Sequence, residues 1–267
     1  MPLPPTIFKY EAFTTRSLLN LKAQSVYYGS PRNFNDPYDC AITASIADPM
    51  PDELQRMRDH YLNAPNVPGD VKLELSKLPI AEFKAQMVKS ARQALSITRE
   101  TFLDKNGVTC FSERNDDLLM WAHYGGQYKG FCLEFRTAYE PFKQLRSVKY
   151  VKQMPQIRVD SMIVEKKFDQ IIDLYCTKSE AWAYEKEWRG IHQTAGTLYT
   201  YESSALKAVY FGPDIELGAL EIICLILSGQ NPEVEFWRSF RSPTEFRVQF
   251  EKFTYTSYAE AKRKGLK

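Results

Sequence analysis

In the segment YKGFCLEFR, residues 128–136, apolar side chains alternate with side chains of other kinds. Phe131, Leu133 and Phe135 occupy every second position, and smaller or charged residues stand between them. A period of two places the three apolar side chains on one face of a β-strand and the intervening residues on the other. The segment therefore predicts a strand that buries one face against a core.

Short apolar and aromatic stretches on both sides of this segment predict further strands. These lie at residues 7–10, 25–29, 108–112, 147–151, 182–192, 207–211 and 246–253. Helical spacing of apolar residues predicts helices at residues 16–23, 116–124 and 159–177, the second of them capped by Asn115. Strands with segregated helices, rather than a regular β–α–β alternation, favour an α+β fold with a mixed or antiparallel sheet.

Residues 48–106 have a different character from the rest of the chain. A polar helix is predicted at residues 52–62, two prolines follow, and apolar residues at helical spacing continue from Pro79 to Phe102. Asn106 and Gly107 then suit a helix C-cap. We therefore expect a single α+β domain over residues 1–267 with a helical insertion at about 48–106.

Composition excludes several classes of protein. The chain has 267 residues, and 35 Lys+Arg against 33 Asp+Glu leave a formal net charge of +2. A nearly neutral chain has no strong overall attraction for nucleic acid or anionic membranes. Its 16 phenylalanines, 16 tyrosines and 4 tryptophans are the unusual feature. They provide a large core and, beside polar residues, the walls of a pocket for a small ligand.

Targeting and cysteine patterns predict a cytoplasmic protein. The start MPLPPTIFKY lacks a basic segment followed by a long apolar one, as a secretory signal requires. The most apolar window, residues 219–227, is much shorter than the about 20 residues that a membrane-spanning helix needs. The five cysteines form no CxxC pair, so we expect reduced thiols and no metal site built on them.

The segment WAYEKEWR, residues 182–189, carries the most specific chemical pattern. Read as one strand, it places Glu185, Glu187 and Arg189 on the same face, with the two carboxylates about 7 Å apart at Cα. Such a pair can divide the work of catalysis: one carboxylate stabilises developing positive charge or holds a substrate hydroxyl, and the other accepts a proton. The alternative interpretation is an ordinary solvated strand face.

Two further segments supply candidate pocket residues. In MWAHY, residues 120–124, Trp121 and Tyr124 are neighbours on a helix, and His123 lies where the chain leaves it. The alternative for His123 is a bond to the last helical carbonyls. In FNDP, Asn35 and Asp36 before a proline suit a tight loop, which needs no functional role.

Other catalytic classes receive little support. Cys110 or Cys132 paired with His123 is the remaining option for a nucleophilic thiol, but both cysteines lie in apolar strand patterns, where inert buried thiols are typical. The chain has no P-loop, GxGxxG, HExxH or GxSxG motif. Nucleotide kinases, Rossmann dehydrogenases, zincins and α/β-hydrolases are therefore disfavoured.

The order of these motifs resembles an uncharacterised bacterial family that is described as a domain of unknown function. The motifs are YxSPxxFNDP at residues 28–37, CFSE at 110–113, MWAHY…KGFCLEF at 120–135, YExEWR at 184–189 and VYFG at 209–212. The resemblance extends over nearly the whole chain. Where relatives often carry a histidine before the KG pair, this chain has Tyr128.

A second resemblance concerns the reaction. A first strand with Lys9 and Tyr10, an aromatic strand that ends in Ser30, and a late Glu-x-Glu look like the order of motifs in ADP-ribosyltransferases. The resemblance implies split sheets, with Glu187 binding the nicotinamide-ribose hydroxyl and stabilising an oxocarbenium-like transition state. It also implies that Glu185 orients or deprotonates the acceptor. The first strand departs from the pattern, because one class of these enzymes opens with arginine and the other with histidine.

These resemblances imply an enzyme that cleaves NAD and modifies a protein or nucleic acid, in a bacterial defence or toxin context. The residues expected to contact NAD are Tyr10, Tyr28, Ser30, Asn35, Trp121, His123, Tyr124 and Arg189. Two alternatives remain open. One is a non-catalytic nucleotide- or peptide-binding module that uses the same cleft. The other is a nuclease or phosphodiesterase with Mg²⁺ held by Asp36, Asp39, Glu185 and Glu187.

Overall fold

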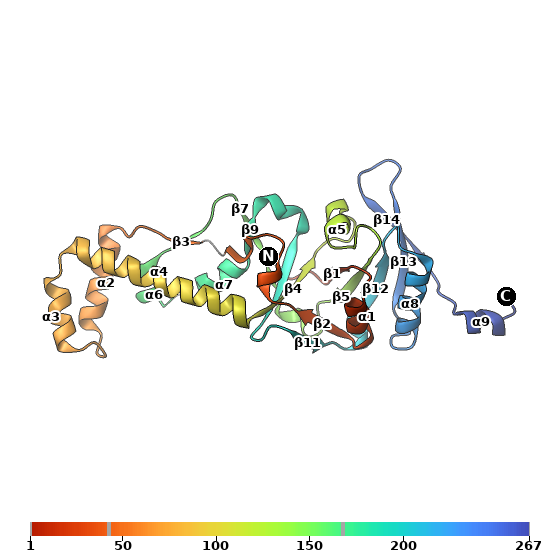
Figure 1. The fold of residues 1–267 in the computed structure, drawn as a ribbon, viewed down its shortest axis with the longest axis horizontal. Coiled ribbons are helices and arrows are strands. Elements are labelled where there is room, and N and C mark those ends of the chain that lie inside the picture. Colours follow the sequence, from red (N-terminus) through yellow and green to blue (C-terminus); the bar gives the residue numbers. More distant parts are fainter. Residues whose placement is uncertain (1, 42–43, 167–168, 267) are drawn as a thin grey trace. The chain divides into compact units, whose positions relative to one another are not determined.

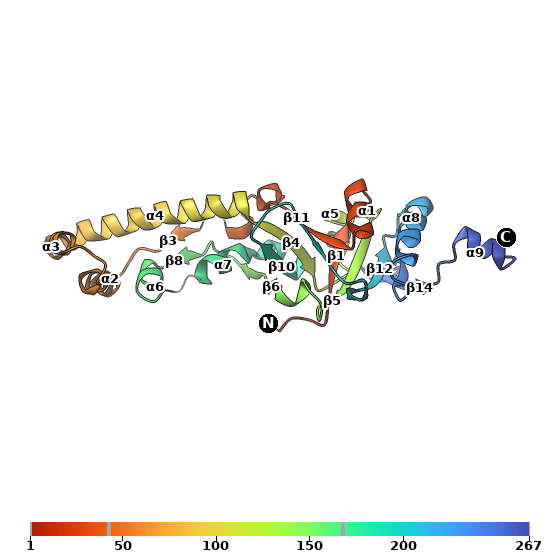
Figure 2. The ribbon, with the colours of Figure 1, turned by 90° about the horizontal axis from the view of Figure 1, so that it is seen from below.

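The computed structural model describes residues 2–41, 44–166 and 169–266 (Figures 1 and 2). The side chains described are those of residues 2–40, 44–166 and 171–266. The chain forms two compact units. The first, called the sheet unit here, comprises Met1–Ser30, Asn106–Val148 and Ala181–Lys267. The second, called the helical unit, comprises Pro31–Lys105 and Lys149–Glu180. The fold class is α+β, as predicted. The single-domain assignment stays a prediction.

The sheet unit is built on a mixed, mostly antiparallel sheet. In the described residues this sheet has eight strands in the order β14-β13-β12-β5-β1-β4-β10-β6. Their bounds are β1 (Thr6–Glu11), β4 (Gly107–Ser112), β5 (Phe131–Arg136), β6 (Arg146–Ser147), β10 (Glu187–His192), β12 (Leu206–Phe211), β13 (Glu235–Arg241) and β14 (Val248–Phe253). A separate antiparallel pair joins β2 (Ser25–Tyr28) to β11 (Thr197–Thr200). The strand predicted over residues 128–136 is thus confirmed from Phe131 onward as β5, in the interior of the sheet, whereas residues 128–130 form a turn.

Strand alternation gives the large sheet two distinct faces. One face, here the core face, buries Phe131, Phe135 and Phe211 under α1 (Thr15–Lys22) and α8 (Leu217–Ser228). The other, here the site face, carries Tyr10, Cys132 and Tyr210 under α5 (Leu118–His123). The apolar window at residues 219–227 lies in α8 and is a core element, as predicted. Among the described residues, no helix is both long and apolar enough to cross a membrane.

The helical unit contains the predicted helical segment at about 48–106. Three helices occur there, α2 (Pro51–Asn63), α3 (Gly69–Lys77) and α4 (Ile80–Lys105), with α2 and α3 at the N-terminal end of α4 (Figure 2). The unit also holds α6 (Val159–Ile163), α7 (Asp169–Tyr175) and the parallel pairs β3 (Ser45–Ile46) with β8 (Gln156–Ile157) and β7 (Lys149–Val151) with β9 (Thr177–Ser179). The rings of Phe102 and Tyr175 stack at a centroid distance of 3.4 Å.

Several predicted boundaries were wrong for local physical reasons. The helix expected at 116–124 begins at Leu118, and its cap is Asp117 rather than Asn115, because the Asp117 carboxylate accepts the backbone N–H of Leu119 and of Met120. Gly107 opens β4 instead of capping α4. The helix expected at 159–177 is divided into α6 and α7, with residues 167–168 outside the described part.

The prediction of one strand over residues 182–192 was also wrong. Residues Glu180–Glu185 form a 3₁₀ helix, η4, and the strand begins only at Glu187. Between them Lys186 has φ 47°, in the left-handed region. Its N–H donates to the Ala183 carbonyl, and its own carbonyl accepts the Glu113 N–H. This turn removes Glu185 from the strand, so Glu185 and Glu187 do not share a strand face.

Candidate functional site

A buried ion pair lies at the start of β10 on the site face. Arg189 Nε donates to Glu187 Oε1 at 2.7 Å, and Arg189 Nη2 donates to Glu187 Oε2 at 3.0 Å. Arg189 is 0% exposed and Glu187 is 5% exposed. Residues i and i+2 of a strand share a face, which brings the two side chains together. Two parallel N–H···O bonds fix the orientation of the Glu187 carboxylate.

A second buried carboxylate, Glu185, is held by donors from two other elements. Tyr124, directly after α5, donates its hydroxyl to Glu185 Oε1 at 2.6 Å. Ser112, at the end of β4, donates its hydroxyl to the Glu185 carbonyl at 2.6 Å. Only 2% of Glu185 is exposed. Its position therefore depends on α5 and β4 together, although it lies outside the strand.

The backbone between the two carboxylates is strained. A left-handed conformation in a residue with a side chain costs roughly 1–2 kcal/mol, and Lys186 adopts it at φ 47°. Strain of this kind persists where surrounding contacts enforce it, and it concentrates at functional sites. Here the turn directs two neighbouring carboxylates into different elements, each with its own donor.

Tyr10 and Trp121 lie on the same face of the sheet as Glu187. Their rings meet edge to face at a centroid distance of 5.2 Å. The Tyr10 hydroxyl donates to the Arg114 carbonyl at 2.9 Å, and the Trp121 indole N–H donates to the Asn115 carbonyl at 2.7 Å. Burial raises the pKa of Tyr10 well above its usual value, so its phenol stays neutral. Both rings are therefore fixed.

His123 is the last residue of α5 and is exposed. Its ring lies at a centroid distance of 6.2 Å from Trp182 and at 6.2 Å from Tyr124. Tyr124 holds Glu185 and Trp182 belongs to η4. The predicted His123 thus lies beside the aromatic side chains that border the carboxylates.

Three predicted residues lie elsewhere. Tyr28 is on the core face: a Cβ built on Gly190 would lie 2.9 Å from the Tyr28 hydroxyl, and Gly190 points opposite to its neighbour Arg189. Ser30 ends the first segment of the sheet unit, after the bridge between Gly29 and Val108. Asn35 belongs to the helical unit and is exposed. We had expected Tyr28 to lie on the same face as Glu187, and this prediction was wrong.

The thiol and metal alternatives can also be placed. Cys132 is 0% exposed, and burial, with the carboxylates of Glu134 and Glu11, raises the pKa of its thiol well above the usual value. Asp36 and Asp39 belong to the helical unit, where Asp39 pairs with the buried Lys178 at 3.3 Å. Within residues 2–41, 44–166 and 169–266, no three His, Cys, Asp or Glu side chains group so as to hold a metal ion.

Sequence reasoning did not identify the supporting residues of β4. Ser112 lies opposite Glu187 in the pairing of β4 with β10, and Cys110 lies opposite Arg189. Glu113 accepts the indole N–H of Trp188 at 2.7 Å. All three residues belong to the CFSE motif at residues 110–113. That motif is one of those on which the family resemblance rests, and it was the signal that could have indicated their role.

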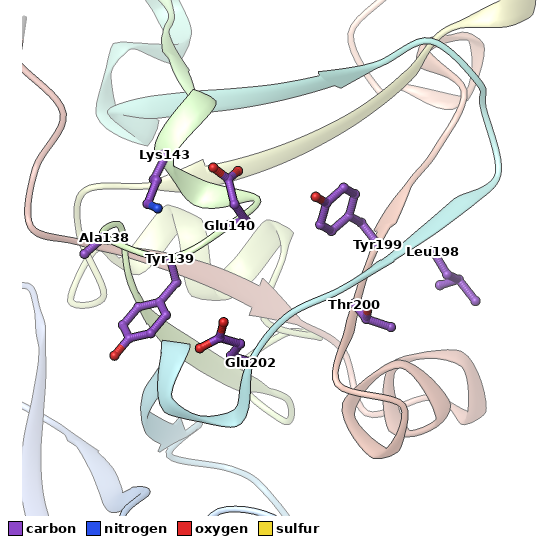
Figure 3. Close-up of a pocket in the computed structure, with 8 residues that line it drawn as sticks. All are labelled: Ala138, Tyr139, Glu140, Lys143, Leu198, Tyr199, Thr200 and Glu202. Atoms are coloured by element: carbon purple, nitrogen blue, oxygen red, sulfur yellow. The ribbon is translucent and has the colours of Figure 1, made fainter.

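A polar groove of about 620 Å³ occurs elsewhere on the sheet unit (Figure 3). It is lined by Ala138, Tyr139, Glu140, Lys143, Leu198, Tyr199, Thr200 and Glu202. None of these residues was predicted to be functional. They come from the segment after β5 and from β11 with its continuation, and their sequence pattern is that of ordinary exposed loops.

Comparisons with known proteins agree with the first resemblance at a coarse level. A protein-family profile described as "Protein of unknown function (DUF2971)" matches residues 120–190, which include most of α5, all of β5 and η4, and the Glu187–Arg189 pair. No curated protein and no solved structure matches the chain. The link to ADP-ribosyltransferases and its split sheets stays a prediction. The similarity to the DUF2971 family, whose function is unknown, thus covers residues 120–190.

Proposed function

We propose that this chain is an ADP-ribosyltransferase-like enzyme, which cleaves NAD between nicotinamide and ribose and transfers ADP-ribose to a macromolecular acceptor. The observation that supports the proposal is the pair of buried carboxylates, Glu185 and Glu187, each held by its own donor. Buried carboxylates with fixed orientations are a common means of stabilising a cationic transition state. A cytoplasmic location and a small nucleotide ligand are part of this proposal.

The proposed reaction needs a carboxylate beside the ribose. When the bond between C1′ and the nicotinamide nitrogen breaks, its electron pair leaves with nicotinamide, which becomes neutral. Positive charge then develops on the ribose, as in glycoside hydrolysis. We assign its stabilisation to Glu187, whose carboxylate is fixed by Arg189 at the start of β10, between β4 and β6. A charge that is already oriented needs no reorganisation during the reaction.

Glu185 is assigned the second role, acceptance of a proton. The acceptor nucleophile forms a bond to C1′ and gives its proton to the Glu185 carboxylate. Tyr124 acts as a positioning residue, because its hydroxyl holds Glu185 Oε1. The separate placement of the two carboxylates, on either side of the Lys186 turn, suits two different tasks better than a shared strand face would.

The direct test is incubation with NAD, followed by chromatography of released nicotinamide. We expect the wild-type chain to release nicotinamide, and Glu187→Gln to lower the rate by about 10²- to 10³-fold. Glu113→Gln is the matched control, because the glutamine oxygen still accepts the Trp188 N–H and the change lies in the adjacent strand segment. The proposal fails if wild type releases no nicotinamide with protein or nucleic-acid acceptors and NAD causes no thermal shift.

A second candidate is a non-catalytic nucleotide- or peptide-binding module. The observation that favours it is the low exposure of Glu187, both of whose oxygens already accept bonds from Arg189. Ion pairs of this kind also serve structure alone. A ligand-dependent rise in melting temperature that persists in Glu187→Ala, without product formation, would favour this candidate over the transferase.

A further inference from the structure

The groove in Figure 3 is lined by two separate segments of the chain. Residues 198–200 of β11 form one wall. The other wall is formed largely by Ala138, Tyr139, Glu140 and Lys143. Its volume of about 620 Å³ is large enough for one or two amino-acid side chains with part of a backbone. The whole groove belongs to the sheet unit.

The groove combines carboxylates with phenol rings. In Figure 3 the Tyr199 hydroxyl points toward Glu140 across the opening, and Glu202 lies beside the Tyr139 ring. Within the described part of the chain, neither glutamate forms an ion pair, and Glu140 accepts only a long bond of 3.4 Å from Gln144. With Lys143 as the cation in the lining, the groove keeps an excess of negative charge. Carboxylates beside aromatic rings suit an ammonium or guanidinium group.

The strand beside the groove has an unpaired edge. In the described residues β11 pairs only with β2. Tyr201 N–H donates to the Gln24 carbonyl at 2.8 Å, and Tyr199 lies opposite Val26. Because bonded and non-bonded pairs alternate in an antiparallel ladder, the N–H and C=O groups of Leu198 and Thr200 point away from β2. They are available to a further strand.

We propose that this groove binds an extended peptide segment of a partner protein, which adds as a strand to the free edge of β11 and places a Lys or Arg side chain between Glu140 and Glu202. Strand addition supplies backbone hydrogen bonds, and the groove supplies selection for the basic side chain. The inference goes beyond the proposed cleavage of NAD and does not depend on it, because it uses none of the site-face residues.

Charge decides among the possible occupants of the groove. An anionic ligand would meet two carboxylates that lack a compensating ion pair. A second copy of this chain, paired through β11, would bring its own Glu140 and Glu202 toward the same groove, and like charges at close range are unfavourable. A basic partner segment is the occupant that complements the charge.

The experiment measures fluorescence anisotropy of a short labelled peptide of alternating threonine and valine with one central arginine. We expect saturable binding to the wild-type chain and about tenfold weaker binding to the double variant Glu140→Gln/Glu202→Gln, since about 1.4 kcal/mol corresponds to tenfold. Glu251→Gln, an exposed carboxylate on β14, is the matched control and leaves binding unchanged. A peptide with glutamate in place of the arginine should not bind.

Thr200→Pro tests the strand addition separately. Proline removes the outward N–H of Thr200 without removing a bond to β2, so the fold persists while peptide binding is lost. Circular dichroism and melting temperature check that the variant is folded. No saturable binding to wild type, equal binding by wild type and either variant, or a dimer in light scattering that Thr200→Pro dissociates would overturn the proposal. Nicotinamide release, measured on the same variants, should not change.

Discussion

The sheet unit places carboxylates in two contrasting environments. Glu185 and Glu187 are almost fully buried, and each is held by a hydroxyl or a guanidinium. Glu140 and Glu202 are exposed at the groove and form no ion pair in the described residues. The difference follows from solvation, because a buried charge without a partner costs several kcal/mol, whereas water solvates an exposed one. Glu185 and Glu187 therefore keep fixed hydrogen-bond partners, whereas the exposed carboxylates of Glu140 and Glu202 can bind a ligand.

The largest effect is expected where the buried pair is broken on one side. Arg189→Met removes the guanidinium that holds the buried Glu187 carboxylate, which should lower the free energy of unfolding by about 3–5 kcal/mol. Urea denaturation measures this loss. The double variant Glu187→Leu/Arg189→Met should recover most of it, because the Glu187 carboxylate is removed together with the guanidinium that holds it. A loss below about 1 kcal/mol in the single variant would mean that the pair is not desolvated.

Alkaline pH should produce the next largest effect, through the buried phenol of Tyr28. Burial raises the pKa of Tyr28 from 10.0 to about 12. Between these two values the unfolded chain loses the phenol proton and the folded chain keeps it, so stability falls as pH rises. One pKa unit corresponds to about 1.4 kcal/mol, so roughly 2–3 kcal/mol is lost across this window. Tyr28→Phe should reduce the slope of stability against pH above pH 10, and an unchanged slope would contradict the assignment.

A smaller loss is expected when Glu185 loses one donor. Tyr124→Phe removes the 2.6 Å bond to Glu185 Oε1 and should cost about 1.5 kcal/mol, the lower end of the range of about 1.5–3 kcal/mol for bonds to charged groups. Tyr139→Phe, at the exposed groove, serves as the control and should change stability by less than about 0.5 kcal/mol. Thermal unfolding of the two variants checks the contrast, and equal losses would contradict it.

The smallest effect is expected at the groove itself. Glu202→Gln removes an exposed carboxylate without an ion pair, so the free energy of unfolding should change by less than about 0.5 kcal/mol. Denaturant titration against wild type measures the difference. A loss above about 1 kcal/mol would show that Glu202 supports the fold and is not available to a ligand.

The amino-acid pattern predicted those features that depend on periodicity. Alternation around Phe131 predicted β5, and apolar spacing predicted α4. Residues 219–227 were predicted to be a buried core element, but their helical conformation in α8 was not predicted. Pattern alone did not predict the turn at Lys186, because a left-handed backbone in lysine is enforced by tertiary contacts, here with Ala183 and Glu113.

The candidate site was predicted in part. Arg189 and Tyr124 were named, and they hold Glu187 and Glu185 respectively. Tyr28 was assigned to the same pocket because its motif stands beside turn residues, yet strand pairing sends its ring to the core face. Which face a side chain takes depends on the register of β2 against its neighbours, and the register is a property of the folded sheet.

The most direct measurement for the central proposal is the rate of nicotinamide release from NAD by wild type, Glu187→Gln and Glu113→Gln under one set of conditions. The proposal predicts release by wild type and by Glu113→Gln, with a loss of about 10²- to 10³-fold in Glu187→Gln. Equal rates for Glu187→Gln and wild type would contradict it, as would the absence of release from all three proteins.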